Sequence, residues 1–368
     1  MQRKVIVFHP ALAPYRIDFF NAIHEAFDVS FYFEHENPLE QKFNREELNK
    51  RVHFTYSYLV PGLFGIKNLR LSVFNILRRE KPAMAFVSEY NLIGVIVLFY
   101  KFIFDRKLKM LITCDDNVEM VSSVGLIKRL VRAALIRWVD LVLVVNDQVK
   151  NWYEKNFTTK AKFFYFPIIQ SDIVFGKRLE DSLFLAQKIR DEYNLNEKKI
   201  VLYVGRLVKV KNVSVLLDAY VHYCDNHNDA VLLIVGDGEE RSALEQRVMP
   251  YIQKGQIIFV GKKEGLELMA YYNLGEIFVL PSVYEPFGTV TNEALLSGCY
   301  VLCSNRAGSS CLIKDGWNGA LFDPMSKQEL VCKLEESLQK VSKERGNRML
   351  SSFDEYVTSF VKCIKSII

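Results

Sequence analysis

Short, almost continuously apolar segments recur along the chain and alternate with longer amphipathic segments. Strands buried on both faces read as such apolar runs, and helices that cover a sheet carry one apolar side. The alternation therefore predicts an α/β fold with parallel strands and helices on both faces of the sheet. In the first half we expect strands at 4–9, 29–33, 53–58, 83–88, 109–113, 141–145 and 163–167.

The alternation restarts after a linker at 171–178, which predicts a second domain. Its first helix is expected at 183–193, and the chain of 368 residues is long enough for two domains of ordinary size. Further strands are expected at 199–204, 230–235, 256–260, 276–280 and 300–304. We place the first domain at 1–172 and the second at 173–351, and we expect a last amphipathic helix at 352–367.

Composition indicates a cytoplasmic protein. The seven cysteines are odd in number and have no metal-site or redox spacing, which is typical of reduced thiols. The N-terminus enters a strand within a few residues, so we expect no signal peptide. The longest apolar run, 92–104, is shorter than the roughly 20 residues that span a bilayer.

Charge is unevenly distributed between the two halves. Residues 1–170 hold 24 Lys and Arg against 17 Asp and Glu, a net charge of +7, whereas the rest has −2. Helices expected at 69–80 and 125–138 carry Arg78, Arg79, Arg129 and Arg132 together with apolar residues. This pattern favours peripheral contact with an anionic membrane, at the inner face of the cytoplasmic membrane, rather than with nucleic acid. Alternatively, these helices only cover the sheet and expose their cations to water.

The segment from Leu280 to Gly298 predicts a ligand site. A strand ends at Leu280, a loop follows, and a helix from 289 ends at Gly298, which suits the residue after a helix end. The first amides of such a helix suit an anion such as phosphate. Carboxylates repel phosphate, so Glu285 in the loop and Glu293 in the helix should face hydroxyl groups. Amides for phosphate and carboxylates for hydroxyls together predict a pocket for a sugar nucleotide.

This segment resembles glycosyltransferase family 4. Glu285 and Glu293 are separated by seven residues, and the flanking Pro-Ser-x-x-Glu-Pro-Phe-Gly and Glu-Ala-Leu-x-x-Gly are similar to that family's signature. The resemblance implies the GT-B architecture, with two Rossmann-like, doubly wound domains facing across a cleft, and a C-terminal helix, 352–368, that joins the first domain. It also implies that Glu285 contacts the transferred sugar and Glu293 the ribose. The residues implied for the leaving diphosphate and nucleotide are Pro286, Phe287, Gly288, Thr289 and Val290.

The loop after the strand at 199–204 extends the resemblance. Gly205-Arg206-Leu207 followed by Lys211-Asn212 looks like the family's segment that binds the diphosphate. Paired cations beside a helix N-terminus can neutralise a leaving diphosphate, although Arg206 and Lys211 could also be solvated surface cations. By resemblance, Gly205, Gly236, Gly261 and Lys262 lie in the loops that surround the nucleotide.

Two groups in the first half are weaker candidates. His9 and Arg16 bracket the loop after the first strand, at the carboxyl edge where doubly wound sheets bind ligands. Asp115 and Asp116 follow another strand at the same edge, and we interpret one of them as an acceptor-side or sugar-contacting residue. The alternatives are a strand-end histidine, a surface arginine and a helix N-cap. The two aspartates lack the spacing of a metal motif, so we expect no metal and no cofactor.

The resulting hypothesis is a retaining glycosyltransferase with a nucleotide-diphosphate sugar as donor. The expected acceptor is a saccharide or lipid-linked saccharide in cell-surface polysaccharide synthesis, bound by the first domain. A catalytically weak GT-B subunit that binds another glycosyltransferase remains the alternative. A nucleotide-sugar epimerase shares the fold, but the flanking sequence does not resemble that group.

Overall fold

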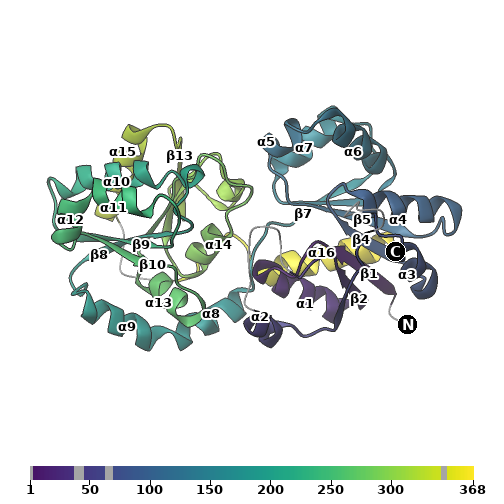
Figure 1. The fold of residues 1–368 in the computed structure, drawn as a ribbon, viewed down its shortest axis with the longest axis horizontal. Coiled ribbons are helices and arrows are strands. Elements are labelled where there is room, and N and C mark those ends of the chain that lie inside the picture. The colour runs from purple at the N-terminus through teal and green to yellow at the C-terminus, as the bar shows by residue number, and fades with distance from the viewer. Residues whose placement is uncertain (1–2, 37–44, 63–68, 341–345) are drawn as a thin grey trace. The chain divides into compact units, whose positions relative to one another are not determined.

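A computed structural model resolves the chain into two α/β units (Figure 1). It describes residues 3–36, 45–62, 69–340 and 346–368. One unit comprises Met1–Ile169 and Phe353–Ile368, and the other comprises Gln170–Ser352. Within the described ranges, no helix combines the length and apolar character that a bilayer crossing requires.

The first unit is built on a parallel sheet with the strand order β3-β2-β1-β4-β5-β6-β7. The order changes direction between β1 and β4, so the loops after these two strands diverge at the carboxyl edge of the sheet. Such a switch point is where doubly wound sheets bind their ligands. The strands are β1 (Lys4–His9), β2 (Asp28–Phe33), β3 (Tyr56–Tyr58), β4 (Met84–Ser88), β5 (Lys109–Cys114), β6 (Leu141–Val144) and β7 (Lys162–Tyr165).

Helices cover both faces of this sheet. Aromatic side chains fill the space between α1, α16 and one face, where the Phe360 ring lies 5.6 Å from Phe19 and 5.7 Å from Phe166. The helices that connect β4, β5 and β6 lie on the opposite face, because parallel connections are right-handed. The helices are η1 (Pro14–Arg16), α1 (Ile17–Ala26), α2 (Arg45–Arg51), α3 (Ser72–Glu80), α4 (Leu92–Ile103), α5 (Val118–Ser122), α6 (Leu126–Trp138), α7 (Asp147–Asn156) and α16 (Phe353–Ile367).

The second unit repeats this plan with the strand order β10-β9-β8-β11-β12-β13. Its switch point lies between β8 and β11, and all its strand pairs are parallel. The strands are β8 (Lys199–Val204), β9 (Ala230–Val235), β10 (Ile257–Gly261), β11 (Ile277–Leu280), β12 (Tyr300–Ser304) and β13 (Gly319–Phe322). Both units are therefore parallel, doubly wound sheets, which confirms the predicted fold class.

The helices of the second unit also form two layers. Helices α10 and α15 pack together on one face, and α8, α9, α13 and α14 pack together on the other. The helices are α8 (Asp172–Asp181), α9 (Leu183–Glu192), η2 (Lys209–Lys211), α10 (Val213–Cys224), α11 (Arg241–Arg247), α12 (Met249–Gln253), α13 (Gly265–Leu274), α14 (Thr289–Leu296), η3 (Gly308–Leu312) and α15 (Lys327–Lys340).

The helix expected at 69–80 differs from the prediction at its start. It begins at Ser72, and Leu71, just before it, is 49% exposed. Arg70 is buried instead, and its guanidinium donates hydrogen bonds to the carbonyl oxygens of Leu59, Val60 and Glu34 at 2.8–3.0 Å. Arg70 therefore fixes the approach to α3 and contributes nothing to a basic surface.

Candidate functional site

The loops after β8 and β11 flank the switch point of the second sheet. The first loop carries Arg206 and leads into η2, whereas the second carries Glu285 and leads into α14. These loops are 74 residues apart in sequence, and an ion pair joins them: the Lys211 ammonium donates to Glu285 Oε2. Ser282 Oγ lies 3.5 Å from the same carboxylate oxygen.

The three glycines expected around the nucleotide end adjacent strands or begin the loops after them. Gly236 has a φ of +148°, and a Cβ on it would lie 1.8 Å from the carbonyl oxygen of Gly205. Its amide donates to the carbonyl oxygen of Gly261 at 2.9 Å. A Cβ on Gly205 would lie 2.7 Å from the Tyr203 hydroxyl. Contact with the backbone of the loop after β8 is therefore sufficient to require glycine at 236, whereas the limit at 205 comes from the Tyr203 side chain of β8.

The cations of this edge differ in environment. Lys211 is mostly buried and pairs with Glu285, whereas the Arg206 side chain is exposed and its carbonyl oxygen accepts the Tyr203 hydroxyl at 2.9 Å. Lys262 is exposed in the loop after β10 and pairs with the exposed Glu264 at 2.6 Å. Arg206 thus remains available to an anion, while Lys262 is partly neutralised.

The loop before α14 leaves that helix open at its N-terminus. Gly288 has a φ of +91°, and no side chain caps the first turn. A Cβ on Gly288 would lie 3.0 Å from the Glu285 side chain and 3.0 Å from Ser309 Oγ, so the loop is closely packed. The amides of Thr289 and Val290 therefore begin a helix whose dipole favours an anion. Phe287 is buried and Pro286 is partly exposed.

Loop 307–309 supports this turn from the other side. The Gly308 amide donates to the carbonyl oxygen of Glu285 at 3.1 Å, and the Ser309 amide donates to that of Phe287 at 2.6 Å. Ser309 Oγ also lies 2.8 Å from Thr291 Oγ1 inside the unit. At the far end, Gly298 has a φ of +85°, which confirms its predicted place after the helix end.

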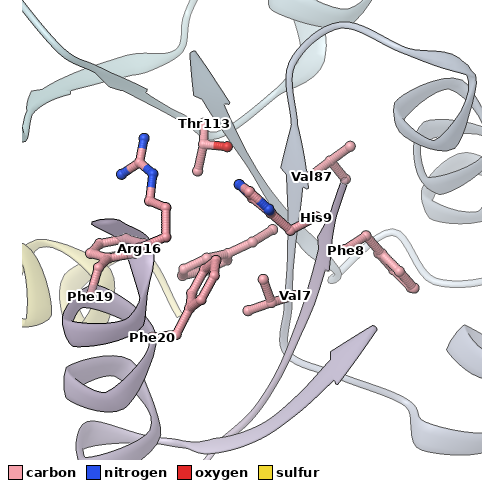
Figure 2. Close-up of a pocket in the computed structure, with 9 residues that line it drawn as sticks. Val7, Phe8, His9, Arg16, Phe19, Phe20, Val87 and Thr113 are labelled. Atoms are coloured by element: carbon pink, nitrogen blue, oxygen red, sulfur yellow. The ribbon is translucent and has the colours of Figure 1, made fainter. Parts of the chain in front are cut away.

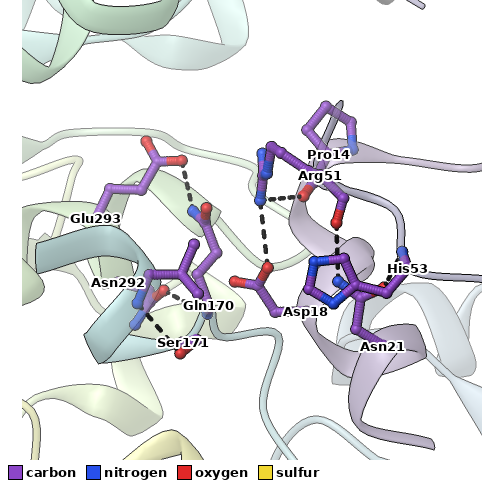
Figure 3. Close-up of polar contacts among 10 residues, drawn as sticks. Pro14, Asp18, Asn21, Arg51, His53, Gln170, Ser171, Asn292 and Glu293 are labelled. Carbon is purple, nitrogen blue, oxygen red and sulfur yellow. Dashed lines mark hydrogen bonds and ion pairs between the residues drawn. The ribbon is translucent and has the colours of Figure 1, made fainter. Parts of the chain in front are cut away.

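Glu293 accepts hydrogen bonds from two residues that the sequence did not indicate, and Figure 3 shows the one from Gln170. The Gln170 amide donates to Oε1 at 2.8 Å, and the Tyr272 hydroxyl donates to Oε2 at 2.7 Å. The Gln170 backbone amide also donates to the Asn292 side chain at 2.9 Å. A carboxylate oxygen can accept more than one hydrogen bond, so these two donors do not by themselves prevent Glu293 from accepting a ligand hydroxyl. Burial and Glu293 raise the pKa of Tyr272 well above its usual value, so this hydroxyl stays a donor.

At the switch point of the first sheet, an ion pair closes the loop after β1. The buried Arg16 guanidinium donates to Asp115 Oδ1, and the Asp115 side chain keeps 28% of its surface exposed. Figure 2 shows Arg16 and His9 on opposite sides of a small cavity that is also lined by Phe20 and Thr113. His9 Nδ1 donates to the carbonyl oxygen of Ala11 at 2.8 Å in the neutral tautomer.

Burial and the Arg16 charge lower the pKa of His9 to about 4. His9 is therefore neutral at physiological pH.

The two aspartates after β5 have different surroundings. Asp116 is buried and accepts from Arg132 Nη2 at 2.8 Å, while the Arg132 guanidinium lies 5.0 Å from the Tyr90 ring centre. Neither aspartate is the N-cap of α5, which was the alternative interpretation. The Asn117 side chain caps this helix by accepting from the Met120 amide. Asp115, the more exposed of the two, is the one that a ligand can reach.

The predicted basic face of 125–138 needs a correction at Arg132. Arg129 is exposed as expected, but Arg132 is 7% exposed and is bound to Asp116. Arg78 and Arg79 of α3 are also exposed, although Arg79 pairs with Glu80 at 2.9 Å. The helical pattern alone could not distinguish an inward from an outward arginine, because the deciding partner lies on another element.

Comparisons with known proteins identify related sequences and folds. The family described as glycosyl transferases group 1 matches residues 186–349. An uncharacterized glycosyltransferase of Methanocaldococcus jannaschii is 33% identical over 135 residues, covering 37% of this chain and 34% of the relative. A second one from the same organism is 26% identical over 313 residues, covering 80% and 76%. The alpha-D-kanosaminyltransferase of Streptomyces kanamyceticus is 29% identical over 151 residues, covering 41% and 39%.

The alignments with the first and third of these relatives span little more than a third of each relative's length. Among solved structures, Anabaena HepE in complex with UDP is 15% identical with a TM-score of 0.74, and 99% of this chain and 100% of that chain are covered. Sucrose-phosphate synthase from Thermosynechococcus elongatus is 17% identical with a TM-score of 0.68, with 99% of both chains covered. The solved structures show a shared fold. The sequence matches confirm, for residues 186–349, the resemblance to glycosyltransferase family 4.

Proposed function

We propose that this chain, whose residues 186–349 belong to the group 1 glycosyl transferases, moves a sugar from a nucleotide-diphosphate sugar to an acceptor hydroxyl with retention at the anomeric carbon. One observation carries the proposal. At the switch point of the second sheet, the Lys211–Glu285 pair lies at the loop that leads into the uncapped N-terminus of α14. A cation and open helix amides suit a diphosphate, and a carboxylate beside them suits the hydroxyls of the attached sugar.

Each residue of this edge has a role in the proposal. Arg206, Lys211 and the amides of 288–290 stabilise the charge that develops on the leaving diphosphate. Glu285 accepts hydrogen bonds from the transferred sugar, and its pairing with Lys211 keeps both side chains oriented. Glu293 accepts the ribose hydroxyls, oriented by its own two donors.

The reaction is a displacement on one face of the sugar. The bond between the anomeric carbon and the acceptor oxygen forms as the bond to the leaving phosphate oxygen breaks. The acceptor proton moves to that phosphate oxygen, and the products are a glycoside and a nucleoside diphosphate. Protein cations and amides supply the electrostatic stabilisation, so we propose that activity needs no metal and no cofactor.

The proposed acceptor is a lipid-linked saccharide of cell-surface polysaccharide synthesis, reached from the cytoplasmic side of the membrane and bound by the first unit. The net charge of +7 over residues 1–170 supports an anionic surface nearby. Asp115 and His9 offer hydroxyl-binding groups at the switch point of the first sheet. One fold neighbour is named a lipopolysaccharide outer core galactosyltransferase, which supports the class of acceptor.

A donor screen tests the proposed function. UDP, GDP and ADP sugars are each added in a thermal-shift experiment, because a ligand at about 100 times its Kd stabilises a protein by about 2.7 kcal/mol. The stabilising donor is then followed by NMR for hydrolysis and transfer, with EDTA present. We expect release of nucleoside diphosphate with retained anomeric configuration.

An inverted product would contradict the retaining mechanism. Binding of the donor without hydrolysis or transfer to any acceptor would favour the catalytically weak subunit instead. Loss of activity in EDTA that only Mg²⁺ or Mn²⁺ restores would contradict the roles given to Arg206 and Lys211.

A further inference from the structure

The outer side of α4 and α6 in the first unit is apolar and exposed to solvent. On α4, Phe99 is 57% and Ile103 is 61% exposed, and on α6, Leu126, Ile127 and Leu130 are 73%, 79% and 62% exposed. The opposite side of α4 is packed into the core through Ile93, Val97 and Tyr100. A helix that is apolar all round is rarely left in water, and clustered exposed apolar residues mark an interaction surface.

The two helices form one surface. Helix α4 connects β4 to β5 and α6 connects β5 to β6, so right-handed connections place both on the same face of the sheet. They also touch: a Cβ on Gly94 of α4 would lie 3.2 Å from the Leu135 side chain of α6. A second contact also involves the C-terminal end of α6, where the ring of Trp138 lies 5.1 Å from that of Phe102 on α4, edge to face. We call the exposed side of these two touching helices the α4–α6 face, and it carries Phe99, Ile103, Leu126, Ile127, Leu130 and Trp138.

The charges on this face indicate which kind of partner it binds. Neither helix contains Asp or Glu, and Lys128, Arg129 and Arg137 are exposed beside the apolar residues. The remaining two cations of the helices are neutralised within the unit, Lys101 by Asp140 and Arg132 by Asp116.

A second copy of the chain would place these exposed cations against one another with no carboxylate of either helix to pair them. An anionic bilayer offers apolar chains to the phenylalanines and leucines and phosphates to the cations. We propose that the α4–α6 face inserts into the interface of an anionic membrane and holds the first unit at the bilayer surface.

This inference adds a membrane-binding surface to the proposed function, and its biological meaning rests on the proposal that the acceptor is lipid-linked. It differs from simple electrostatic adsorption, because most of the face is apolar. Salt screens exposed charges, whereas burial of apolar side chains persists at high ionic strength. Binding should therefore weaken with added salt but should not be abolished by it.

Vesicle flotation tests the proposal without any sugar donor or acceptor, so its outcome is independent of catalysis. The full-length protein is mixed with phosphatidylcholine vesicles that do or do not contain phosphatidylglycerol. The test variant is Phe99→Ser with Ile127→Ser and Leu130→Ser, and we expect partitioning to fall about tenfold or more. The matched control is Ile173→Ser with Phe184→Ser, which are 71% and 80% exposed on the second unit, and its partitioning should equal that of the wild type.

A fluorescence experiment locates the inserted surface. Trp138 lies on the α4–α6 face, so brominated acyl chains should quench its emission, and Trp138→Phe should remove the quenched component. Unchanged flotation of the triple variant, or flotation without quenching of Trp138, would overturn the proposal. The proposal would also be overturned if the wild type did not bind the vesicles and formed a dimer that the triple variant does not form. Analytical ultracentrifugation measures this. Thermal unfolding of the triple variant verifies that it is folded.

Discussion

Charged side chains are arranged differently at the carboxyl edges of the two sheets. At the first edge, two arginines are buried and each is paired with an aspartate, Arg16 with Asp115 and Arg132 with Asp116. At the second edge, Lys211 is paired with Glu285, but Arg206 is exposed and the N-terminus of α14 has no side-chain cap.

Two similar folds therefore offer different electrostatic surfaces at the same topological position. At the first edge both arginines are paired with aspartates and Glu89 lies near the same carboxylates, so this edge offers acceptors that suit saccharide hydroxyls. At the second edge the exposed Arg206 and the open N-terminus of α14 suit a diphosphate.

The largest expected effect tests whether the charges of the first edge are structural. Arg132→Met leaves the buried Asp116 carboxylate without its partner, which should lower the free energy of unfolding by about 3–5 kcal/mol. Urea denaturation of the full-length protein measures the change. Arg129→Met is the matched control, because Arg129 is exposed on the same helix, and its midpoint should not move.

Adding Asp116→Asn to Arg132→Met should recover part of the loss, because no unpaired charge remains. If Arg132→Met is as stable as Arg129→Met, the first edge is not held by this ion pair.

Turnover should fall when Lys211, the mostly buried cation of the second edge, is replaced. Lys211→Met deletes a charge that faces the proposed leaving diphosphate, and we expect kcat to fall about 10²–10³-fold. Lys209→Met is the control, since Lys209 is an exposed residue of the same 3-10 helix, and its kcat should match that of the wild type. Steady-state kinetics at saturating donor compare the two. Equal kcat values for both variants would remove Lys211 from the proposed mechanism.

The difference between features set by local sequence and features set by long-range contacts explains how much could be predicted from the sequence. The alternation of apolar and amphipathic segments was sufficient for the fold class, because it is a local pattern. The loop and helix around α14 were also predictable, since Glu285, Gly288, Glu293 and Gly298 lie within one short stretch of sequence.

The side-chain contacts at the first edge were predicted less well, because each depends on a partner that is far away in the sequence. Arg16 and Asp115 are 99 residues apart, and the buried side of Arg132 is set by an aspartate on another element. Even at the second edge, the donors to Glu293 could not be predicted, because Gln170 lies 123 residues away at the start of the unit.

Acid should destabilise the first edge through His9. Its pKa is about 4 in the folded protein and 6.5 in an unfolded chain, so the unfolded state binds a proton first as pH falls. The contribution of neutral His9 is present in full above about pH 6.5 and is lost as pH falls through 4, for a total of up to about 3 kcal/mol. His9→Asn keeps a donor towards the carbonyl oxygen of Ala11 but does not titrate.

The wild type should therefore lose up to about 3 kcal/mol of unfolding free energy relative to His9→Asn as pH falls from neutral to 4. A difference that stays constant over this range would place His9 in a more hydrated environment than the structure gives it.

The finest comparison lies within the second edge, between its two glutamates. Glu293 is proposed to bind ribose, and charge-assisted hydrogen bonds contribute about 1.5–3 kcal/mol each. Glu293→Gln removes the charge and turns an amide towards Gln170 or Tyr272, both of which already donate. Affinity for the free nucleoside diphosphate should therefore fall about tenfold or more.

Glu285→Gln should behave differently, because its proposed ligand is the sugar. It should reduce turnover while the affinity for free nucleoside diphosphate stays nearly unchanged. Tyr272→Phe serves as a graded control, since it removes one donor to Glu293 and keeps the carboxylate. Calorimetry with the nucleoside diphosphate separates these outcomes, because the ligand contains ribose and phosphates but no transferred sugar. Wild-type affinity in Glu293→Gln, or a large loss in Glu285→Gln alone, would reverse the roles proposed for the two carboxylates.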